Sequence, residues 1–383
     1  MMKIVADESI PFVKECFSSI GEVELVSGRG ITPETAADAD VLLVRSITPV
    51  NSSLLAKSSV RFVGTATIGF EHIDVDFLKK QNIGFASAPG SNANSVAEYV
   101  VAAMLEVAQK YDFKLEGKSI GIVGVGNVGS RVEKKVKVLG MKVFLNDPPL
   151  QRETGDSKYL PLKELFGCDF ITLHTPLTFE GIDKTFHLAG EEFFKSLKAG
   201  CIFFNTSRGG VVDTGALKAA KKTGRLGAVV LDVWEDEPNI DVELLEMVDI
   251  GTPHIAGYSL DGKIAGVIMI YKAACEYFGV EAKFGAESFL PEPAMAELKI
   301  DRREGGEQQV LRRTIERIYD IKEDDRQLRR ILDTSAEKRG RLFDRMRKDY
   351  PVRREFQNTR IVLEDRNSSL AKKLEGIGFK IKS

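Results

Sequence analysis

A glycine-rich stretch near the middle of the chain constrains the fold more than any other feature. Gly124, Gly126 and Gly129 form the pattern G-x-G-x-x-G. Residues 119–123 before it make a short apolar run of the kind found in buried parallel strands. After it, apolar residues recur at helical spacing between 128 and 139. The stretch therefore predicts a strand, a tight glycine turn and a helix.

An acidic residue follows the next strand. Gly140 is suited to end the helix, residues 142–145 have the composition of a strand, and Asp147 lies 18 positions after Gly129. In dinucleotide-binding β-α-β units the glycines let a pyrophosphate approach the helix N-terminus, and the acid binds the ribose hydroxyls. A carboxylate there repels a 2′-phosphate. We therefore predict NAD as the cofactor, with a purely structural glycine turn as the weaker interpretation.

Strands and helices alternate on both sides of this unit. Candidate strands occupy residues 3–6, 23–26, 39–44 and 61–64, and later 169–173, 201–205, 228–232 and 249–252. Such alternation is typical of parallel sheets covered by helices on both faces. The predicted fold class is α/β, with two doubly wound parallel-sheet domains, Rossmann- or flavodoxin-like, and a small C-terminal α/β domain.

Local signals give the predicted domain boundaries. Ser95 and Glu98 have the spacing of a capping box before an apolar helix at 99–109, which places a junction near residue 95. The sequence 291–293, Pro-Glu-Pro, is expected to be a linker. Charged amphipathic helices are expected over 306–350, and a small β-α-β unit over 359–382. The predicted domains are 1–95 with 257–288, 96–256, and 289–383.

Composition separates the end of the chain from the rest. Residues 301–383 contain 23 Lys and Arg and 16 Asp and Glu, which gives a net charge of +7. The whole chain contains 54 and 56, so residues 1–300 hold 31 and 40, a net charge of −9. This asymmetry predicts a separate C-terminal module. The apolar runs are too short to span a membrane, and the start of the chain does not resemble a signal peptide. Four scattered cysteines indicate reduced thiols, a cytoplasmic location and no metal site.

Three polar residues that follow predicted strands could carry redox chemistry. Arg208, Glu237 and His254 each lie just past a strand of the nucleotide-binding half. Oxidation of an alcohol needs a base, for which histidine is suited near neutral pH, and a carboxylate can orient the imidazole. An arginine can bind an anionic substrate. A structural role for His254 is the alternative, and His174 is the rival base. We expect His72 and His187 to be structural or surface residues.

At these motifs the chain resembles the D-2-hydroxyacid dehydrogenases. The matching stretches cover residues 1–285 and are specific in combination: 94–98, 124–129, 205–210, 232–238 and 252–257. The resemblance implies that Arg208 binds the substrate carboxylate, that Glu237 supports His254, and that His254 is the acid/base. It also implies an NAD site made of Gly124, Gly126, Asn127, Val128, Gly129, Asp147, Thr175, Thr206, Ser207, Asp232 and Gly257.

Within that family the chain is most similar to the branch that oxidises 4-phospho-D-erythronate in pyridoxal phosphate biosynthesis. Residues 44–48, 62–69 and 88–95 carry this likeness, as do the additional C-terminal domain and its segment 350–356. The resemblance implies the product 3-hydroxy-2-oxo-4-phosphooxybutanoate and a homodimer formed through the C-terminal domain. The implied substrate contacts are Arg45, Ser46, Ala66, Thr67 and Tyr258.

A phosphorylated substrate needs additional positive charge. Arg45 is one candidate for the phosphate. Because the C-terminal segment is basic and the body acidic, Arg353 or Arg354 is a second candidate, acting across the dimer.

Three other interpretations stay open. The chain could oxidise another 2-hydroxyacid, such as 3-phosphoglycerate, although the C-terminal segment lacks the length and strand content of a regulatory domain. It could be an NAD-sensing corepressor on the same fold. Nucleic-acid binding by the basic segment is disfavoured because acids are interleaved throughout it.

Overall fold

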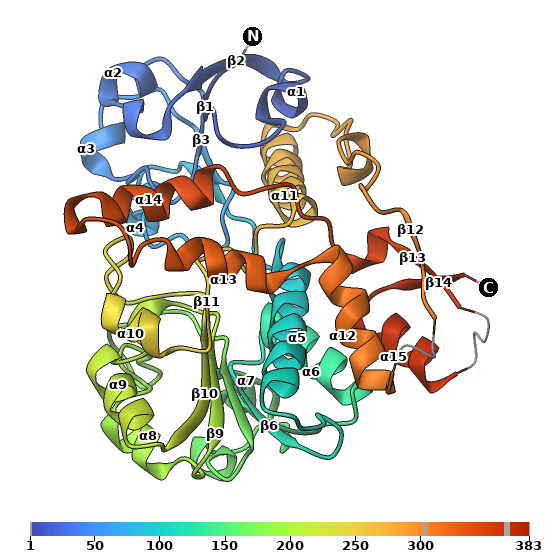
Figure 1. Cartoon of the computed structure of the whole chain (residues 1–383). Helices are drawn as coiled ribbons and strands as arrows, with labels where there is room; N and C mark the ends of the chain where they lie inside the picture. The colour runs from blue at the N-terminus through green and yellow to red at the C-terminus, as the bar shows by residue number, and fades with distance from the viewer. Residues whose placement is uncertain (1, 302–304, 364–367, 383) are drawn as a thin grey trace. The chain divides into compact units, whose positions relative to one another are not determined.

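The protein is described by a computed structural model that covers residues 2–301, 305–363 and 368–382. Its contacts divide the chain into two compact units. The first comprises residues 1–92 with 259–292, and the second comprises 93–258 with 293–383. Each unit is built around parallel sheets with helices on their faces, which confirms the predicted fold class (Figure 1).

The first unit holds a five-stranded parallel sheet in the order β2-β1-β3-β4-β5. Its strands are β1 (Met2–Asp7), β2 (Gly21–Val26), β3 (Val41–Val44), β4 (Phe62–Thr65) and β5 (Gly84–Ala86). Its helices are α1 (Val13–Phe17), α2 (Pro33–Ala36), α3 (Ser52–Leu55), α4 (Val75–Lys80) and α11 (Leu260–Phe278), with 3-10 turns η1 (Gly28–Gly30) and η4 (Ala286–Ser288). Strand β5 and helices α2 and α4 were not predicted from the sequence.

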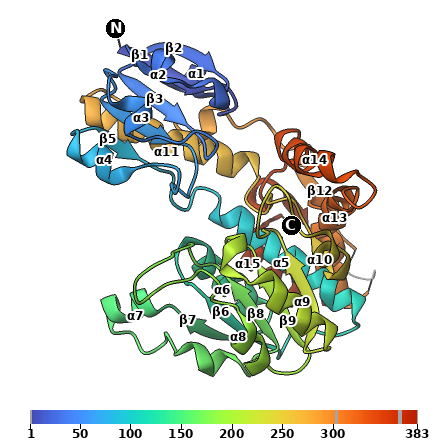
Figure 2. The ribbon, with the colours of Figure 1, turned by 90° about the vertical axis from the view of Figure 1, so that its left-hand side faces the viewer.

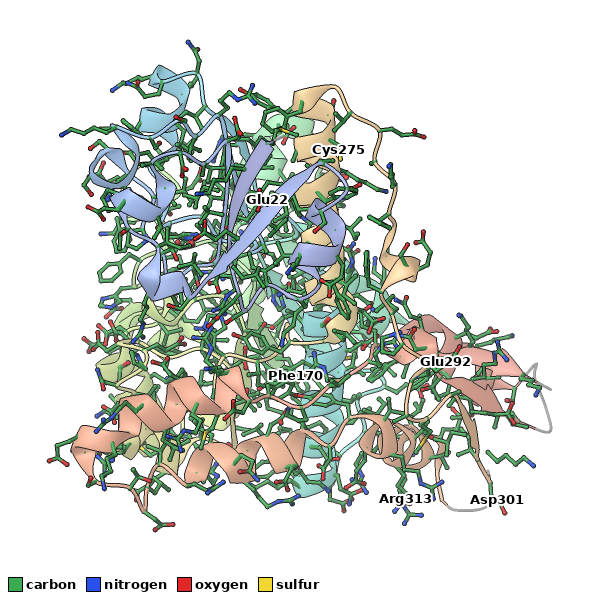
Figure 3. All side chains as sticks on the ribbon, turned by 90° about the horizontal axis from the view of Figure 1, so that it is seen from above. Glu22, Phe170, Cys275, Glu292, Asp301 and Arg313 are labelled. Atoms are coloured by element: carbon green, nitrogen blue, oxygen red, sulfur yellow. The ribbon has the colours of Figure 1, made fainter. Side chains whose placement is uncertain are left out.

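Alternate residues of each strand in this sheet enter opposite cores. Ile4 of β1 and Leu43 of β3 pack against one side of α11, where Cys275 is labelled in Figure 3. Val5 and Leu42 lie on the other face of the sheet and pack against α3 and α4. Burial on both faces explains why these strands are continuous apolar runs. The carboxyl ends of β3 and β4 carry Arg45, Ser46, Ala66 and Thr67.

The second unit contains a six-stranded parallel sheet in the order β11-β10-β9-β8-β6-β7. Its strands are β6 (Ser119–Val123), β7 (Lys142–Asn146), β8 (Phe170–Leu173), β9 (Cys201–Asn205), β10 (Leu226–Leu231) and β11 (Ile250–Gly251). Its helices are α5 (Ala93–Lys110), α6 (Asn127–Val138), α7 (Pro148–Thr154), α8 (Glu191–Ser196), α9 (Thr214–Lys222) and α10 (Val242–Met247), with 3-10 turns η2 (Leu162–Leu165) and η3 (Gly209–Val211). The strand order reverses between β6 and β8, where open sheets of this kind bind ligands.

Helices cover both faces of this second sheet (Figure 2). Phe170 and Phe204 point to the core beneath α5 and α6. Their neighbours Ile171 and Phe203 point to the opposite core, beneath α8 and α9. The alternation follows directly from the two-residue period of strands.

Within the described ranges, the C-terminal residues of the second unit form a small three-stranded parallel sheet and four helices. The sheet has the order β12-β13-β14, with β12 (Glu297–Lys299), β13 (Arg360–Val362) and β14 (Lys380–Lys382). The helices are α12 (Glu307–Ile318), α13 (Ile321–Arg329), α14 (Ala336–Lys348) and α15 (Ser369–Ile377), with the 3-10 turn η6 (Phe356–Asn358). The amphipathic helices and the final β-α-β unit were predicted, whereas β12 was not.

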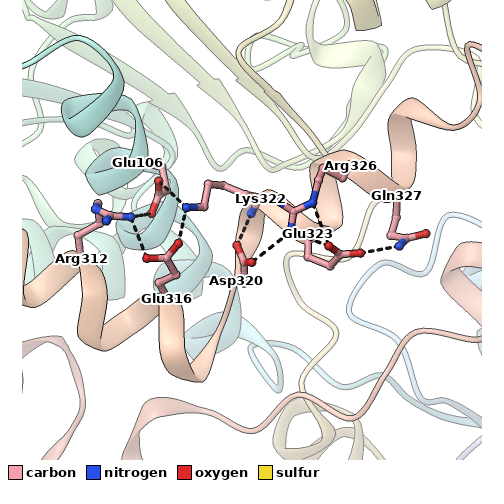
Figure 4. Close-up of polar contacts among 8 residues, drawn as sticks. All are labelled: Glu106, Arg312, Glu316, Asp320, Lys322, Glu323, Arg326 and Gln327. Carbon is pink, nitrogen blue, oxygen red and sulfur yellow. Dashed lines mark hydrogen bonds and ion pairs between the residues drawn. The ribbon is translucent and has the colours of Figure 1, made fainter.

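Ion pairs join this C-terminal region to α5, which packs on the six-stranded sheet (Figure 4). Glu106 of α5 accepts a hydrogen bond of 2.8 Å from Arg312 of α12 and lies 3.7 Å from the Lys322 ammonium of α13. Glu316 pairs with the same two cations. Leu311 and Ile315 are buried in the same core as α5. The C-terminal region thus packs against α5 within the second unit.

The predicted capping box at Ser95 is wrong. Helix α5 begins at Ala93, so Ser95 and Glu98 lie inside it. The Ser95 hydroxyl donates to Glu355 at 2.7 Å, and Glu98 accepts from the backbone N–H of Phe356 at 3.0 Å. Both side chains have tertiary partners in the C-terminal region, and these partners replace the local cap that the spacing indicated.

Candidate active site

The glycine turn has the shape that a dinucleotide requires. Gly124 has φ +85°, which favours glycine, and a Cβ atom at Gly129 would lie 2.0 Å from the Gly124 carbonyl oxygen. Close packing of helix on strand therefore requires the last glycine. Gly126 is different, because a Cβ there would meet nothing within 4 Å. It borders the open side of the turn, beside Asn127 at the start of α6.

The residues around this turn fit a bound NAD. Val128 lies in the first turn of α6, whose N-terminus can bind phosphate. Asp147 follows β7, where it accepts from the N–H groups of Val125 at 2.8 Å and Leu150 at 3.0 Å. Across the turn, the Thr175 hydroxyl is buried and has no hydrogen-bond partner within the described part of the chain. A buried hydroxyl without a partner is unfavourable unless a ligand supplies one.

The loop after β9 holds Thr206, Ser207 and Arg208. The Ser207 hydroxyl and backbone N–H both donate to Asn205 Oδ1, at 2.8 and 3.1 Å, and Asn205 in turn donates to the Arg208 carbonyl at 3.0 Å. Gly209 lies against Trp234, and a Cβ there would lie 1.8 Å from the Trp234 carbonyl oxygen. These contacts fix the loop at the carboxyl edge of the sheet, with the Arg208 side chain partly exposed.

The side chains of Glu237 and His254 meet. Glu237 Oε2 lies 2.8 Å from His254 Nδ1, and Glu237 Oε1 accepts from the Trp234 N–H at 2.8 Å. Burial alone would raise the pKa of Glu237, but the His254 imidazole, these hydrogen bonds and Arg347 outweigh it and lower the pKa. The carboxylate is therefore held ionised beside the ring. His254 has φ +58°, a conformation that costs free energy and is common at functional sites.

Asp232 anchors the loop that carries His254 through hydrogen bonds. Its carboxylate accepts from the Thr252 hydroxyl at 2.6 Å and from the N–H groups of Ile255 and Ala256 at 2.8 and 3.0 Å. The Tyr99 hydroxyl lies 2.7 Å from the Thr252 hydroxyl and extends the chain of contacts. Spacing along the sequence gave no signal for Tyr99 or Thr252, because their contacts are purely tertiary. Gly257 ends this loop, and Tyr258 follows it.

His174 is unsuited to be the base. Its Nε2 lies 3.0 Å from the Thr172 hydroxyl and its Nδ1 lies 3.2 Å from the Thr206 hydroxyl, so both ring nitrogens are engaged. Burial lowers the pKa of His174 to about 3. His72 contacts Thr65, and His187 contacts Glu235 at 2.6 Å. His187 also has a carboxylate partner, but of the four histidines only His254 has one and lies in the loop after β11, where the base was predicted.

The predicted substrate residues of the first unit cluster at the ends of β3 and β4. The Arg45 Nε donates to the fully buried Asp7 carboxylate at 2.9 Å, which fixes the guanidinium. The Thr67 hydroxyl donates to the Gly69 carbonyl at 2.9 Å and lies 2.7 Å from the Thr65 hydroxyl. Ser46 is exposed and Ala66 is half-buried. Each of these four residues follows a strand at the carboxyl edge of this sheet.

Arg353 does not lie on the surface of its chain. It is 7% exposed, its guanidinium donates to the Ala256 carbonyl at 2.5 Å, and its Cζ lies 4.3 Å from the centre of the Tyr319 ring. These contacts hold it within its own chain, while its Nη1 is buried and has no hydrogen-bond partner among the described residues. Arg354 donates to Asn358 at 2.9 Å.

Known proteins with this sequence pattern and fold are dehydrogenases. Residues 93–256 match the family described as D-isomer specific 2-hydroxyacid dehydrogenase, NAD binding domain. The chain is 43% identical over 381 residues to erythronate-4-phosphate dehydrogenase of Proteus mirabilis, covering 99% of both chains, and 42% identical over 382 residues to that of Hahella chejuensis, covering all of both. The chain belongs to the erythronate-4-phosphate dehydrogenase family. This confirms the predicted relationship, and the protein is an NAD-dependent dehydrogenase.

Solved structures agree with this membership of the erythronate-4-phosphate dehydrogenase family. A 3-phosphoglycerate dehydrogenase of Entamoeba histolytica with bound NAD is 27% identical, with a TM-score of 0.62 over 76% of this chain and 99% of its own. A D-lactate dehydrogenase of Aquifex aeolicus with NAD and lactic acid is 26% identical, with a TM-score of 0.58 over 72% of this chain and 95% of its own. Residues 289–378 match a domain of unknown function.

Within the described ranges, no helix has the length and apolar character needed to cross a membrane.

Proposed function

We propose that this dehydrogenase oxidises 4-phospho-D-erythronate to 3-hydroxy-2-oxo-4-phosphooxybutanoate in pyridoxal phosphate biosynthesis. The observation that carries the proposal is the 2.8 Å contact between Glu237 and His254, in a chain 43% identical over its length to erythronate-4-phosphate dehydrogenase of Proteus mirabilis. When bound, NAD would supply the acceptor for the hydride that leaves C2 of the substrate. The residues of the chain bind the substrate, orient it and take the hydroxyl proton.

His254 is proposed to take that proton at Nε2. Its Nδ1 faces the ionised Glu237, so we assign the ring proton to Nδ1, which leaves the Nε2 lone pair as the base. After proton transfer the carboxylate stabilises the imidazolium. Because Glu237 is itself held by the Trp234 N–H, the pair needs little reorganisation during the reaction.

Arg208 is proposed to bind the substrate carboxylate through a two-pronged ion pair. Arg45 is proposed to bind the phosphate, with Ser46, Ala66, Thr67 and Tyr258 as further substrate contacts. Support for Arg45 comes from its fixed guanidinium, since the buried Asp7 orients it without covering all of its donors. The NAD-binding residues are proposed to be those of the glycine turn with Asp147, Thr175, Thr206, Ser207, Asp232 and Gly257.

The first test is a comparison of substrates. We expect NADH formation with 4-phospho-D-erythronate to exceed that with 3-phosphoglycerate and D-lactate, and to be lost in His254→Ala. A 2-oxo acid acceptor in a parallel assay reveals turnover that is limited by slow NADH release. Preference for 3-phosphoglycerate would replace the proposed substrate. NAD binding without turnover of any of the three would favour the corepressor interpretation.

We also propose a cytoplasmic homodimer assembled through the C-terminal region. Four buried cysteines that are free thiols fit a reducing compartment. For the dimer, the support is the family resemblance together with Val352, a C-terminal valine that is 73% exposed. Light scattering of purified wild type and Val352→Asp tests it. A monomeric wild type at micromolar concentration would contradict the dimer.

A further inference from the structure

Helix α14 contacts the segment that carries Glu237. A Cβ atom at Gly340 of α14 would lie 2.6 Å from Asn239 Oδ1 and 3.4 Å from Pro238 Cγ. Only glycine lets the helix approach the two residues after Glu237 this closely. One turn further on, Phe343 is fully buried in the same apolar cluster as Trp234, whose N–H binds Glu237.

The same face of α14 also reaches Tyr258. Gly340, Phe343 and Arg347 are spaced at i, i+3 and i+7, which places them along one side of a helix. The Arg347 Cζ lies 5.7 Å from the centre of the Tyr258 ring. The Tyr350 ring meets the Tyr258 ring edge-on, at 5.9 Å and 84°. Arg347 in the last turn of α14 and Tyr350 just beyond the helix therefore position the ring of a proposed substrate contact.

Arg347 is only partly exposed and faces the Tyr258 ring. Within the described residues its Nε is buried and has no hydrogen-bond partner. Burial opposes its charge, but the neighbouring Tyr258 and Glu237 outweigh burial and raise the pKa of Arg347. Reciprocally, Arg347 is among the groups that lower the pKa of Glu237. The cation thus acts on both the ring and the carboxylate.

We propose that Arg347 is a positioning residue of the dehydrogenase site, through which helix α14 gives the C-terminal region a role in catalysis within its own chain. The inference rests on the proposed roles of Glu237, His254 and Tyr258. A guanidinium near an aromatic ring stabilises the ring's placement, and a cation near Glu237 favours the ionised carboxylate that orients His254. The match of residues 289–378 to a domain of unknown function assigns no such role.

Kinetics of three variants on α14 test the proposal. Arg347→Ala is expected to lower kcat about 10-fold or more while the KM for NAD stays within about 2-fold of wild type, because Arg347 acts through Glu237 and Tyr258. Arg347→Lys restores the charge and is expected to recover the pH profile of kcat and part of its magnitude. Arg345→Ala is the matched control, since Arg345 is exposed on the same helix. Equal kcat and pH profiles for Arg347→Ala and Arg345→Ala would overturn the proposal.

A measurement without substrate separates this inference from the proposed reaction. The chain has four histidines, so the ring signals of His254 can be assigned in NMR spectra by comparison with His254→Ala. The Arg347 guanidinium faces the ring of Tyr258, which lies four residues after His254, so Arg347→Ala is expected to shift the His254 ring signals at one fixed neutral pH. Arg347→Lys and Arg345→Ala are expected to leave these signals in place. Unshifted His254 signals in Arg347→Ala would contradict the proposal even if 4-phospho-D-erythronate is the substrate. Shifted signals would support the proposal even if the substrate is another hydroxy acid.

Discussion

The environment of each imidazole distinguishes the proposed base from its rival. His174 lies between two hydroxyls and burial lowers its pKa to about 3, so it stays neutral and hydrogen-bonded. His254 has a carboxylate at Nδ1 that can stabilise a positive ring. Sequence position placed both residues after strands of the same sheet. Only the three-dimensional contacts separate their roles.

Loss of the Glu237 charge is predicted to impair catalysis while NAD binding is kept. Glu237→Gln preserves shape but removes the carboxylate that orients His254 and stabilises its protonated form. We expect kcat to fall by about 10²–10⁴, the range typical of acid–base catalysis. Asp236→Asn, at the exposed neighbouring position, is the control and is expected to keep wild-type kcat. Steady-state kinetics and NAD titration measure both. A wild-type kcat for Glu237→Gln would refute the assigned role.

At the scale of elements, patterns dominated by burial and backbone geometry were predictable from sequence. The glycine turn, the parallel strands and the face of α6 follow from residue spacing, because each is set by local geometry and a buried sheet. The capping box failed because Ser95 and Glu98 bind a segment about 260 residues away. Short elements such as α2 and β5 were missed since three or four residues carry little periodic signal.

Two glycines of the same turn are predicted to respond differently to alanine. Gly129→Ala places a Cβ 2.0 Å from the Gly124 carbonyl oxygen, so we expect a loss of about 1–3 kcal/mol of stability from overpacking. Gly126→Ala meets no protein atom within 4 Å and should keep the wild-type Tm, yet weaken NAD binding because its methyl group occupies the open side of the turn. Thermal unfolding and NAD titration check the pair. Unchanged NAD affinity in Gly126→Ala would show that the cofactor lies elsewhere.

The start of β8 is predicted to lose stability in acid. Asp169 accepts from Ser119 and from Lys198 at 2.6 Å. Partial burial would raise the pKa of Asp169, but these contacts outweigh it and lower the pKa to about 2. Because the folded-state pKa lies below the unfolded one, the stabilisation is present above about pH 4 and is lost as the pH falls toward 2.

Asp169→Asn should therefore weaken the pH dependence of the free energy of unfolding between about pH 4 and 2. Urea unfolding at several acidic pH values measures the effect, with Asp333→Asn, at an exposed position, as the control for removing a surface carboxylate. An Asp169→Asn profile parallel to that of wild type between pH 4 and 2 would contradict the expectation.

At the scale of the molecule, the C-terminal region is part of the second unit's core. Val310 and Leu311 of α12 and Leu374 of α15 join the core beneath α5, while Leu328 and Phe343 join the core on the opposite face. The charge asymmetry indicated a C-terminal module, but composition cannot show which apolar faces meet. Arg347 was missed for a similar reason: it is one of many cations on an amphipathic helix, and only its contacts distinguish it.

A chain that ends at residue 292 is predicted not to keep a stable nucleotide-binding sheet. Removal of residues 293–383 would expose the apolar faces of both cores and leave the buried Lys135 and Glu98 without their C-terminal partners. We expect loss of the cooperative thermal transition and of NAD binding. A truncated chain with the wild-type Tm and NAD affinity would show instead that residues 293–383 form an independent module.

The most direct measurement of the central claim follows the hydrogen at C2 of the substrate. We would supply 4-phospho-D-erythronate deuterated at C2 with NAD, identify the nicotinamide product by mass spectrometry, and compare wild type with His254→Ala. Direct hydride transfer predicts that the deuterium appears in NADH made by wild type, and that His254→Ala makes almost none. NADH without deuterium, or undiminished formation in His254→Ala, would contradict the account of this site.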